Sequence, residues 1–246
     1  MELRIVSTGS KGNCYVLKDK SGSMLMLDCG VNMQEVYKAI DFNVNALSSC
    51  LLSHVHKDHS LSADKMLKEF MPVTMSKLTA QELGINLQDA SLTIAEHDKS
   101  VVFGNWTVMP FETFHDAPGS LGYLIYNSLE DMKIAYITDT GYIKHTFKNL
   151  NSLIVECNFD EETIEEHKEE IKERYLRVRE SHMSLERLLS YLSKTDKSAL
   201  RNIVLVHLSD GNSTESKMID KVKIASGANV EAARPGATIN LDAVPF

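Results

Sequence analysis

The amino-acid sequence predicts an α/β (α+β) fold in which two β-sheets pack against each other with helices on the outside. Short apolar runs of β type fill much of both halves of the chain, and helix-like stretches lie between them. Several of these runs stop at a polar residue, namely Asp28, His54, Asp139, Glu156 and His207. Because sites on layered folds gather where strands end, we expect these side chains to meet.

The expected strands and helices fall into two sets along the chain. Gly-containing turns such as TGSKGN and DKSGS separate the first strands. In the first set, strands are expected at 3–7, 14–18, 23–29 and 49–54, and helices at 62–71 and 79–84. In the second set, strands are expected at 92–96, 100–104, 106–113, 121–127, 133–139, 153–157 and 201–208.

Residues 158–180 differ from the rest because charged side chains dominate this segment. Ile164, Ile171 and Tyr175 leave only a narrow apolar stripe at helical spacing. We interpret the segment as a solvated helix that lies on the domain. A role in contacting substrate stays open for its basic end, residues 174–179.

Length and composition bound the class of protein. We expect one domain, residues 1–246, because no interdomain linker or internal repeat interrupts the chain. A formal net charge of −8 excludes a general cationic surface of the kind that wraps nucleic acid. Four scattered cysteines without a CxxC pair, no signal-peptide pattern and no apolar run of membrane-spanning length favour a cytoplasmic protein with no membrane partner.

The segment HVHKDH places four ligand-type side chains, His54, His56, Asp58 and His59, within six residues. Packing alone gives no reason for this clustering, whereas first-row metals prefer imidazole and carboxylate ligands held at close range. His54 and His56 are two residues apart, so in an extended segment both rings point to one side. The turn that follows offers Asp58 and His59 as a second pair, which suits two metals about 3.5–4 Å apart.

Each metal needs further ligands, and three later residues stand just after apolar strands: His115, Asp139 and His207. To the first ion we assign three histidines: His54, His56 and His115. To the second ion we assign Asp58, His59 and His207. Asp139 is placed between the two ions, because a bridging carboxylate can reach both. This donor set favours zinc, with manganese and iron(II) as alternatives.

HVHKDH is similar to the signature of the metallo-β-lactamase superfamily, and the order His115, Asp139, His207 resembles that of its later motifs. The resemblance extends from STGSKGN near residue 10 to VHLSDGNS near residue 210. It implies a four-layer αββα sandwich with the metals at the edge of the two sheets. It also implies that Asp28, in LDCG, supports the histidine loop from behind the ligands.

The flanking motifs GSKGN, SHMS and HLSDGN resemble those of YycJ/WalJ-type proteins, PhnP phosphodiesterases and tRNase Z nucleases. Other branches of the superfamily fit less well. True zinc β-lactamases usually carry cysteine at the position of Asp139, and flavodiiron proteins carry glutamate at that of His56. The closer resemblance implies that a metal-activated water hydrolyses a phosphodiester.

Three candidate catalytic residues accompany this resemblance: Asp58, Glu156 and His182. His182 occupies the position of the general acid, which protonates the leaving oxygen. Glu156, in LIVECN, would orient this histidine or act as an acceptor behind it. A second interpretation of His182 is a helix-capping or surface histidine, because Ser181 and Ser184 are good caps.

The loop GSKGN also has two interpretations. Its glycines, with Ser10 and Asn13, can form a tight strand connection that binds nothing. Alternatively, the backbone amides and the Asn13 side chain face a phosphate, which makes Ser10 and Asn13 candidate substrate-binding residues.

The expected function is that of a dinuclear metal-dependent phosphodiesterase or nuclease acting on nucleic-acid ends or on small nucleotide and cyclic phosphodiesters. Two alternatives stay open. The first is a hydrolase of thioesters or lactones, which has no need of an acid at His182. The second is a non-catalytic module that binds metal and a partner, although the intact ligand set counts against it. Related phosphodiesterases are often homodimers, and the sequence leaves that state open.

Overall fold

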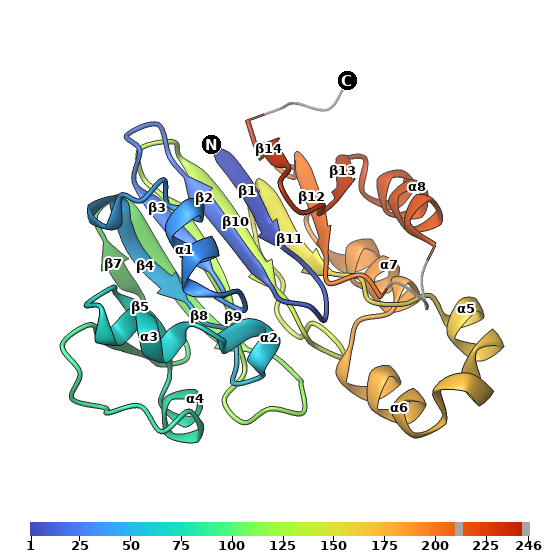
Figure 1. The fold of residues 1–246 in the computed structure, drawn as a ribbon. Coiled ribbons are helices and arrows are strands. Elements are labelled where there is room, and N and C mark those ends of the chain that lie inside the picture. The colour runs from blue at the N-terminus through green and yellow to red at the C-terminus, as the bar shows by residue number, and fades with distance from the viewer. Residues whose placement is uncertain (210–213, 243–246) are drawn as a thin grey trace.

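The computed structural model describes residues 1–209 and 214–242, apart from the side chains of 169–171, 173 and 174. Two seven-stranded sheets pack face to face, as Figure 1 shows. The order in the first sheet is β14 (Thr238–Asn240), β1 (Glu2–Ser7), β2 (Cys14–Lys18), β3 (Met24–Leu27), β4 (Leu47–Leu51), β5 (Val73–Ser76) and β6 (Leu92–Ala95). The order in the second is β13 (Asn229–Ala232), β12 (Asn202–Val206), β11 (Ser152–Glu156), β10 (Met132–Ile137), β9 (Leu121–Asn127), β8 (Trp106–Glu112) and β7 (Val101–Phe103).

Helices cover the outer face of each sheet. Against the first sheet pack α1 (Met33–Ala39), α3 (Ala63–Lys68) and α4 (Lys77–Glu82). Against the second pack α7 (Leu185–Lys194) and α8 (Glu215–Ser226). The remaining helices are the short η1 (Val44–Ala46), α2 (Lys57–Ser60), α5 (Glu161–Glu166) and α6 (Lys168–Ser181). The prediction of two packed sheets with helices outside is therefore confirmed.

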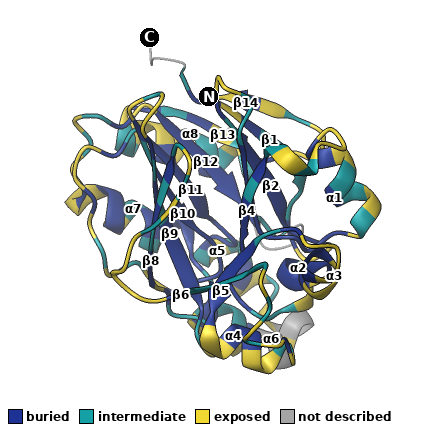
Figure 2. Cartoon of the chain, turned by 90° about the vertical axis from the view of Figure 1, so that its left-hand side faces the viewer, coloured by how far each residue is buried: buried dark blue, intermediate teal, exposed yellow. Residues whose placement is uncertain are grey.

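Strand alternation explains why both faces of each sheet are apolar. In β2, Tyr15 and Leu17 point into the core between the sheets, whereas Cys14 and Val16 pack beneath the helices of the first sheet. Strands β11 and β12 are buried along their whole length, as expected for parallel strands with both faces covered. Figure 2 shows the buried residues concentrated in the sheets and the exposed ones on outer helices and loops.

Strand direction decides where the polar strand ends meet. β3 to β6 run parallel in the first sheet, and β10 to β13 run parallel in the second. Parallel neighbours present their carboxyl ends at the same edge of a sheet, which is where ligands bind in such folds. A hydrogen bond of 2.5 Å from the Tyr136 hydroxyl to Asp28 joins the two sheets at this edge.

The charged segment after β11 differs from its prediction, because one straight helix is replaced by α5 and α6 with non-helical backbone at Lys172. Ile164 and Tyr175 both belong to a small buried cluster with Phe159. Eleven helical residues span about 16 Å, too far for both side chains to reach one such cluster from a straight helix. The chain bends so that the sparse apolar residues share one contact. The side chain of Ile171, the third member of the predicted stripe, lies outside the described set.

The predicted set leaves out strands β5, β13 and β14 and helices α1, α7 and α8. Strand β5 has the mixed sequence VTMS, and β13 and β14 at the sheet edges are short and partly exposed. Such segments carry a weak alternation signal, and pairing with a neighbouring strand fixes them. In the part of the chain that the structure describes, no helix has the length and apolar character needed to cross a membrane.

At the end of the sandwich opposite to this edge, Asp19 joins the two sheets. One of its oxygens accepts hydrogen bonds from Ser21 and Ser23 in its own turn. The other accepts from Asn105 and Asn127 of the second sheet, each at 3.1 Å. Burial favours the neutral acid, but these donors outweigh it and lower the pKa of Asp19.

We expect Asp19→Asn to destabilise the protein by about 1–3 kcal/mol at pH 7, because an amide nitrogen would then face donors across the sheets. Since the folded-state pKa is lowered, the carboxylate contributes stability above its unfolded pKa of about 3.9 and loses it as the pH falls through the folded value. Urea unfolding at several pH values should show the gap between variant and wild type shrinking below pH of about 4. Asp64→Asn, at an exposed i,i+4 ion pair, is the control and should change little. A gap independent of pH would contradict this role.

Candidate metal centre

The loop between β4 and α2 holds His54 and His56 at the shared edge, and the short helix α2 holds His59. His54 Nε2 lies 3.1 Å from His56 Nδ1, which in turn lies 3.1 Å from Nε2 of His115. His54 is buried and His56 half-buried. The structure thus brings together the three histidines that the sequence analysis assigned to a first ion, with their donor atoms within 4.8 Å of one another.

Hydrogen bonds on the far sides of these rings fix which nitrogen faces inward. His115 Nδ1 lies 2.8 Å from the Ser181 carbonyl, which can only accept, so Nδ1 donates this hydrogen bond and Nε2 is the nitrogen that faces His56. His54 Nδ1 contacts the hydroxyl of Ser53 at 2.9 Å. Such outer partners orient metal-binding imidazoles. Three ring nitrogens that converge on one point cannot all find hydrogen-bond partners in one another. A bound cation could accept electron pairs from all three.

A second group gathers Asp58, His59 and His207, also within 4.8 Å. The Asp58 carboxylate lies 3.6 Å from His59 Nε2 and 3.7 Å from His207 Nε2. His207 directly follows β12 and has a positive φ of 54°. Strained backbone of this kind in a non-glycine residue is concentrated at functional sites.

The carboxylate of Asp139, just beyond β10, lies between the two groups. Its Oδ2 is 4.0 Å from His54 and 3.7 Å from His115, on the side of the first group. Its Oδ1 is 3.3 Å from His59 and 3.0 Å from His207, on the side of the second. Each oxygen therefore faces a different set of imidazoles, which is the geometry expected of a carboxylate that bridges two ions.

Asp28 holds the histidine loop from below. Its fully buried carboxylate accepts from the backbone and hydroxyl of Ser53 at 2.7 and 2.9 Å, from Tyr136, and from His59 Nδ1 at 2.7 Å. The bond to His59 turns the opposite ring nitrogen, Nε2, toward Asp139. This contact matches the supporting role that the resemblance implied for Asp28.

The charges at the centre fit divalent cations. Burial and the neighbouring His59 lower the pKa of His54, so this ring is neutral and has a free lone pair. Burial opposes charge on His59, but Asp139 and Asp28 raise its pKa to about 10, and the pKa of His207 is likewise raised by Asp139. The carboxylates thus draw protons onto buried rings. Cations would supply the same positive charge and are the natural occupants of this donor set.

His182 and Glu156 form a hydrogen-bonded pair beside the second group. His182 Nδ1 lies 2.6 Å from Glu156 Oε1, while Oε2 accepts from the backbone amides of Thr140 and Met183. Burial disfavours charge on His182, but the Glu156 carboxylate raises its pKa. His182 is also the C-cap residue of α6, where its backbone amide donates to the Val178 carbonyl, while its ring contacts Glu156.

The two predicted substrate-binding residues lie in different surroundings. Ser10 is exposed and lines a cavity of about 910 Å³ that also contains His56, Asp58, Asp139, His182 and His207. Asn13 is fully buried and does not line that cavity. Its Nδ2 lies 3.0 Å from His59 Nε2, and its Oδ1 accepts from the backbone of Gly9. This geometry favours a positioning role for Asn13 over contact with a substrate. Residues 210–212 of the HLSDGN motif lie outside the described residues.

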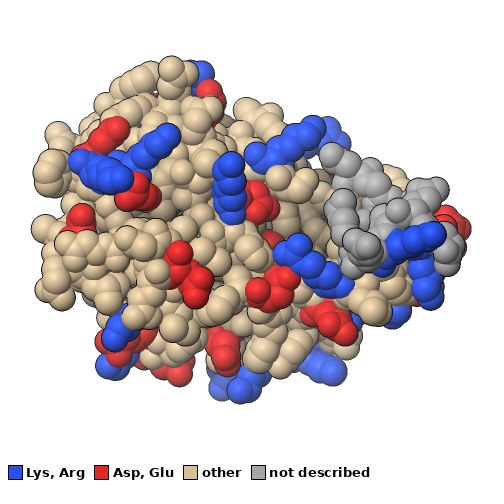
Figure 3. Space-filling view, turned by 60° about the horizontal axis from the view of Figure 1, so that its bottom comes forward, with Lys and Arg blue, Asp and Glu red and all other residues tan. Residues whose placement is uncertain are grey.

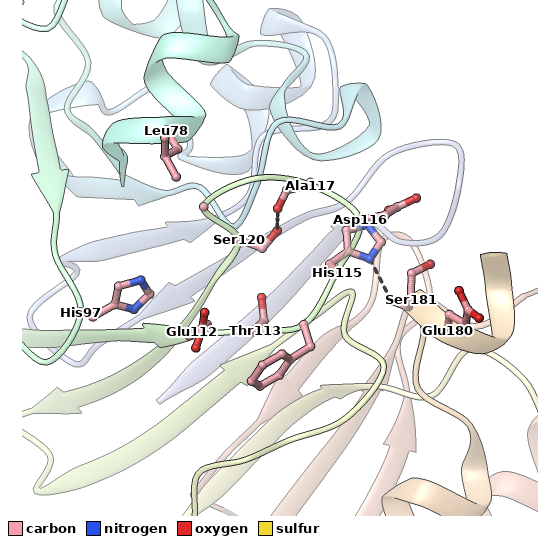
Figure 4. A pocket seen from close by; sticks show the side chains of 12 residues that line it. Leu78, His97, Glu112, Thr113, His115, Asp116, Ala117, Ser120, Glu180 and Ser181 are labelled. Atoms are coloured by element: carbon pink, nitrogen blue, oxygen red, sulfur yellow. Dashed lines mark hydrogen bonds and ion pairs between the residues drawn. The ribbon is translucent and has the colours of Figure 1, made fainter.

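A second cavity, of about 550 Å³, lies against the loop that carries His115. Figure 4 shows His97 and Glu112 toward one end, Ser181 and Glu180 on α6 at the other, and His115 between them. Acidic side chains are prominent in its lining, which includes Glu112, Asp116 and Glu180.

Three residues at the centre escaped the sequence analysis: Ser53, Tyr136 and Asp116. Ser53 precedes His54 directly, and its position alone could have suggested a supporting hydroxyl. Tyr136 lies on the inward face of a predicted strand and resembles any core aromatic. Asp116 lies 3.1 Å from His115 Nε2 and 2.5 Å from Nε of Arg177, contacts that only the folded chain reveals.

The sequence of this chain is similar to that of a curated bacterial protein. The chain is 28% identical over 176 residues to a protein of Bacillus anthracis described as exodeoxyribonuclease YycJ. That match covers 67% of this chain and 65% of the relative, so the chain spans just under two thirds of the relative's length.

Solved structures share the fold. The metallo-β-lactamase fold protein YhfI of Bacillus subtilis superposes with a TM-score of 0.74 at 14% identity, covering 97% of this chain and 99% of that one. The short form of human tRNase Z superposes with a TM-score of 0.61 at 15% identity, covering 98% and 99%. These likenesses confirm the αββα architecture that the resemblance implied.

The model of the beta-lactamase superfamily domain matches residues 25–208, from β3 through the histidine loop to the residue after His207. The match includes the histidine loop, His115, Asp139, the Glu156–His182 pair and His207, and this fold implies divalent metals, for which these side chains offer groups of ligand atoms. The chain therefore belongs to the beta-lactamase superfamily.

Proposed function

We propose that this protein is a dinuclear metal-dependent phosphodiesterase that hydrolyses nucleic-acid ends or small nucleotide phosphodiesters. The observation that carries the proposal is the His182–Glu156 pair, 2.6 Å apart, because His182 lines the same cavity as His56, Asp58, Asp139 and His207. A lactone or thioester hydrolase would use the same metals but has no need of this acid. The YycJ relative, described as an exodeoxyribonuclease, agrees with the proposal.

The residues that would hold the first ion are His54, His56 and His115. Those that would hold the second are Asp58, His59 and His207, with Asp139 between the two. When bound, the ions would polarise a phosphoryl oxygen and lower the pKa of a water molecule. Zinc suits this imidazole-rich set, and manganese or iron(II) remain alternatives.

The chain's own residues supply proton transfer and orientation. Asp58 lines the cavity and is partly exposed, so its carboxylate can accept a hydrogen bond from the attacking water. His182 donates a proton to the leaving oxygen, because its Nδ1 is held by Glu156 and Nε2 is left for the substrate. Burial opposes charge on Glu156, but His182 lowers the pKa of this carboxyl, and the amides of Thr140 and Met183 hold its Oε2 in place. We further propose that the protein acts in the cytoplasm as a single domain, and leave a homodimer as a hypothesis.

Metal content tests the ligand assignment. Elemental analysis of protein soaked in Zn²⁺ or Mn²⁺ and desalted should give about two ions per chain. Asp139→Ala should lose affinity for both ions, because its oxygens face both groups, whereas His54→Ala should weaken chiefly the first. His145→Ala, at a histidine that is stacked on Phe147 and tilted against Phe111 outside the groups, should keep both ions. Wild-type protein that stays metal-free after soaking would refute the assignment.

We expect His182→Ala to lower kcat on a short oligonucleotide about 10²–10⁴-fold while both ions remain bound. The loss should be smaller on bis-p-nitrophenyl phosphate, because p-nitrophenolate leaves without a proton. Glu156→Gln should show the same dependence on the leaving group. A merely structural role would reduce both rates equally, so equal losses on the two substrates would contradict the proposed acid.

Substrate class is tested with wild-type protein loaded with Zn²⁺ or Mn²⁺. A panel of short RNA, single-stranded DNA, 2′,3′- and 3′,5′-cyclic nucleotides, lactones and thioesters should show turnover of phosphodiesters. Turnover of acyl substrates alone would replace the proposal with the lactone or thioester alternative. Biological effects that survive Asp139→Ala would favour the non-catalytic module.

A further inference from the structure

Two cavities lie beside the proposed metal centre, and their charges differ. The larger cavity is lined by four basic side chains, Lys11, Lys57, Arg177 and Arg234, and by three carboxylates, Asp58, Asp139 and Glu215. The smaller cavity in Figure 4 is lined by three carboxylates and, among its described lining residues, by neither lysine nor arginine. A chain of phosphates is therefore attracted to the first cavity and repelled by the second.

Ion pairs neutralise two of the four basic groups. Arg177 contacts Asp116 at 2.5 Å, and Arg234 contacts Glu215 at 2.5 Å. Lys11 and Lys57 are exposed, and among the described residues neither forms an ion pair with a carboxylate. In Figure 3, acidic and basic side chains are interspersed over the face shown, so this face offers no broad positive field. Within the described part of the chain, Lys11 and Lys57 are the lysine and arginine side chains of this cavity that form no ion pair with a carboxylate.

Close backbone packing holds Lys11 and Lys57 on the same rim of the larger cavity. Lys11 lies in the β1–β2 loop and Lys57 opens α2, and the Asn13 amide donates to the Asp58 carbonyl at 2.6 Å between them. A Cβ atom on Gly30 would lie 1.7 Å from that carbonyl, and one on Gly12 would lie 2.2 Å from Gly30. Only glycine at both positions allows the loops to approach this closely. The rim is thus fixed by the same contacts that place Asp58.

We propose that Lys11 and Lys57 bind phosphates that flank the scissile one, so that the preferred substrate is a single strand of nucleic acid rather than an isolated phosphodiester. This inference rests on the proposed function and narrows its substrate class. Lysine attracts phosphate as a point charge and does not read the sugar, so DNA and RNA strands are both accommodated. Two cations are too few for a long duplex, where many phosphate contacts are required.

Kinetics on two substrates test the proposal. With single-stranded 12-mers of DNA and RNA, Lys11→Ala and Lys57→Ala should each raise KM about tenfold, the effect of one lost charge-assisted contact. With bis-p-nitrophenyl phosphate, which has no flanking phosphate, both variants should match wild type. The slope of log KM against log salt should fall by about 0.7 for each lysine removed. Lys57→Arg, which keeps the charge, should restore the wild-type KM.

The controls distinguish phosphate binding by Lys11 and Lys57 from a general effect of surface charge and from a loss of metal ions. Lys99→Ala removes an exposed lysine paired with Glu96 outside this cavity and should leave KM and salt slope unchanged. Elemental analysis of each variant should show wild-type metal content, because Lys57 adjoins two proposed ligands. Equal effects of Lys99→Ala and Lys57→Ala would overturn the proposal.

Binding distinguishes failure of this inference from failure of the proposed function. Fluorescence anisotropy of a labelled 12-mer of single-stranded DNA should show a Kd that both lysine variants weaken about tenfold, whether or not the strand is cleaved. If wild type hydrolyses no phosphodiester yet binds the strand through these lysines, the proposed reaction is refuted and the proposed phosphate binding by the two lysines is supported. If wild type cleaves the strand and neither variant changes KM, Kd or salt slope, the rim is refuted. Absence of measurable strand binding at low salt would also refute it.

Discussion

Four carboxylates, Asp28, Asp58, Asp139 and Glu156, are drawn together at one edge of the sandwich, and balancing their charge is the constraint on which the centre depends. Three of them are fully or almost fully buried, where an uncompensated negative charge is costly. Imidazoles from four separate loops supply the partners. The raised pKa values of His59, His182 and His207 show how strongly these carboxylates demand positive charge. A pair of divalent cations would meet the same demand, which links the fold's electrostatics to its proposed chemistry.

The architecture makes this concentration of charge possible because parallel strands of both sheets end at the same edge. The helices on the outside allow β11 and β12 to be buried along their whole length, with their polar residues at the strand ends. Asp28 and Tyr136 then join the sheets by a direct bond, and Asp28 and His207, at two of these ends, both have a positive φ. Packing of the two sheets therefore holds together, at this edge, side chains that are far apart in the chain.

The negative total charge does not oppose a phosphate substrate, because the local charges differ from the average. Arg177 and Arg234 are matched by neighbouring carboxylates, whereas Lys11 and Lys57, beside the centre, form no ion pair with a carboxylate of the described residues. The loops that carry these lysines are packed backbone to backbone through Gly12 and Gly30. The same packing buries Asn13 against His59, a position that favours support of the histidine loop over contact with a substrate. The close approach of the backbone at Gly12 and Gly30 thus positions both the loop that carries Asp58 and the rim that carries the two lysines.

The sequence by itself determined the density of donors in HVHKDH, the alternation of apolar strands and the polar residues at their ends, because these are local patterns of residue type. From them the two-sheet fold and the grouping of seven donor side chains could be predicted. Only the tertiary structure decided which oxygen of Asp139 faces which group, which nitrogen of His115 points inward, and which basic side chains are neutralised, because each depends on residues far apart in the chain. The bend in the charged segment at Lys172 belongs to the same class, since it follows from a shared contact with Phe159 that no helical periodicity encodes.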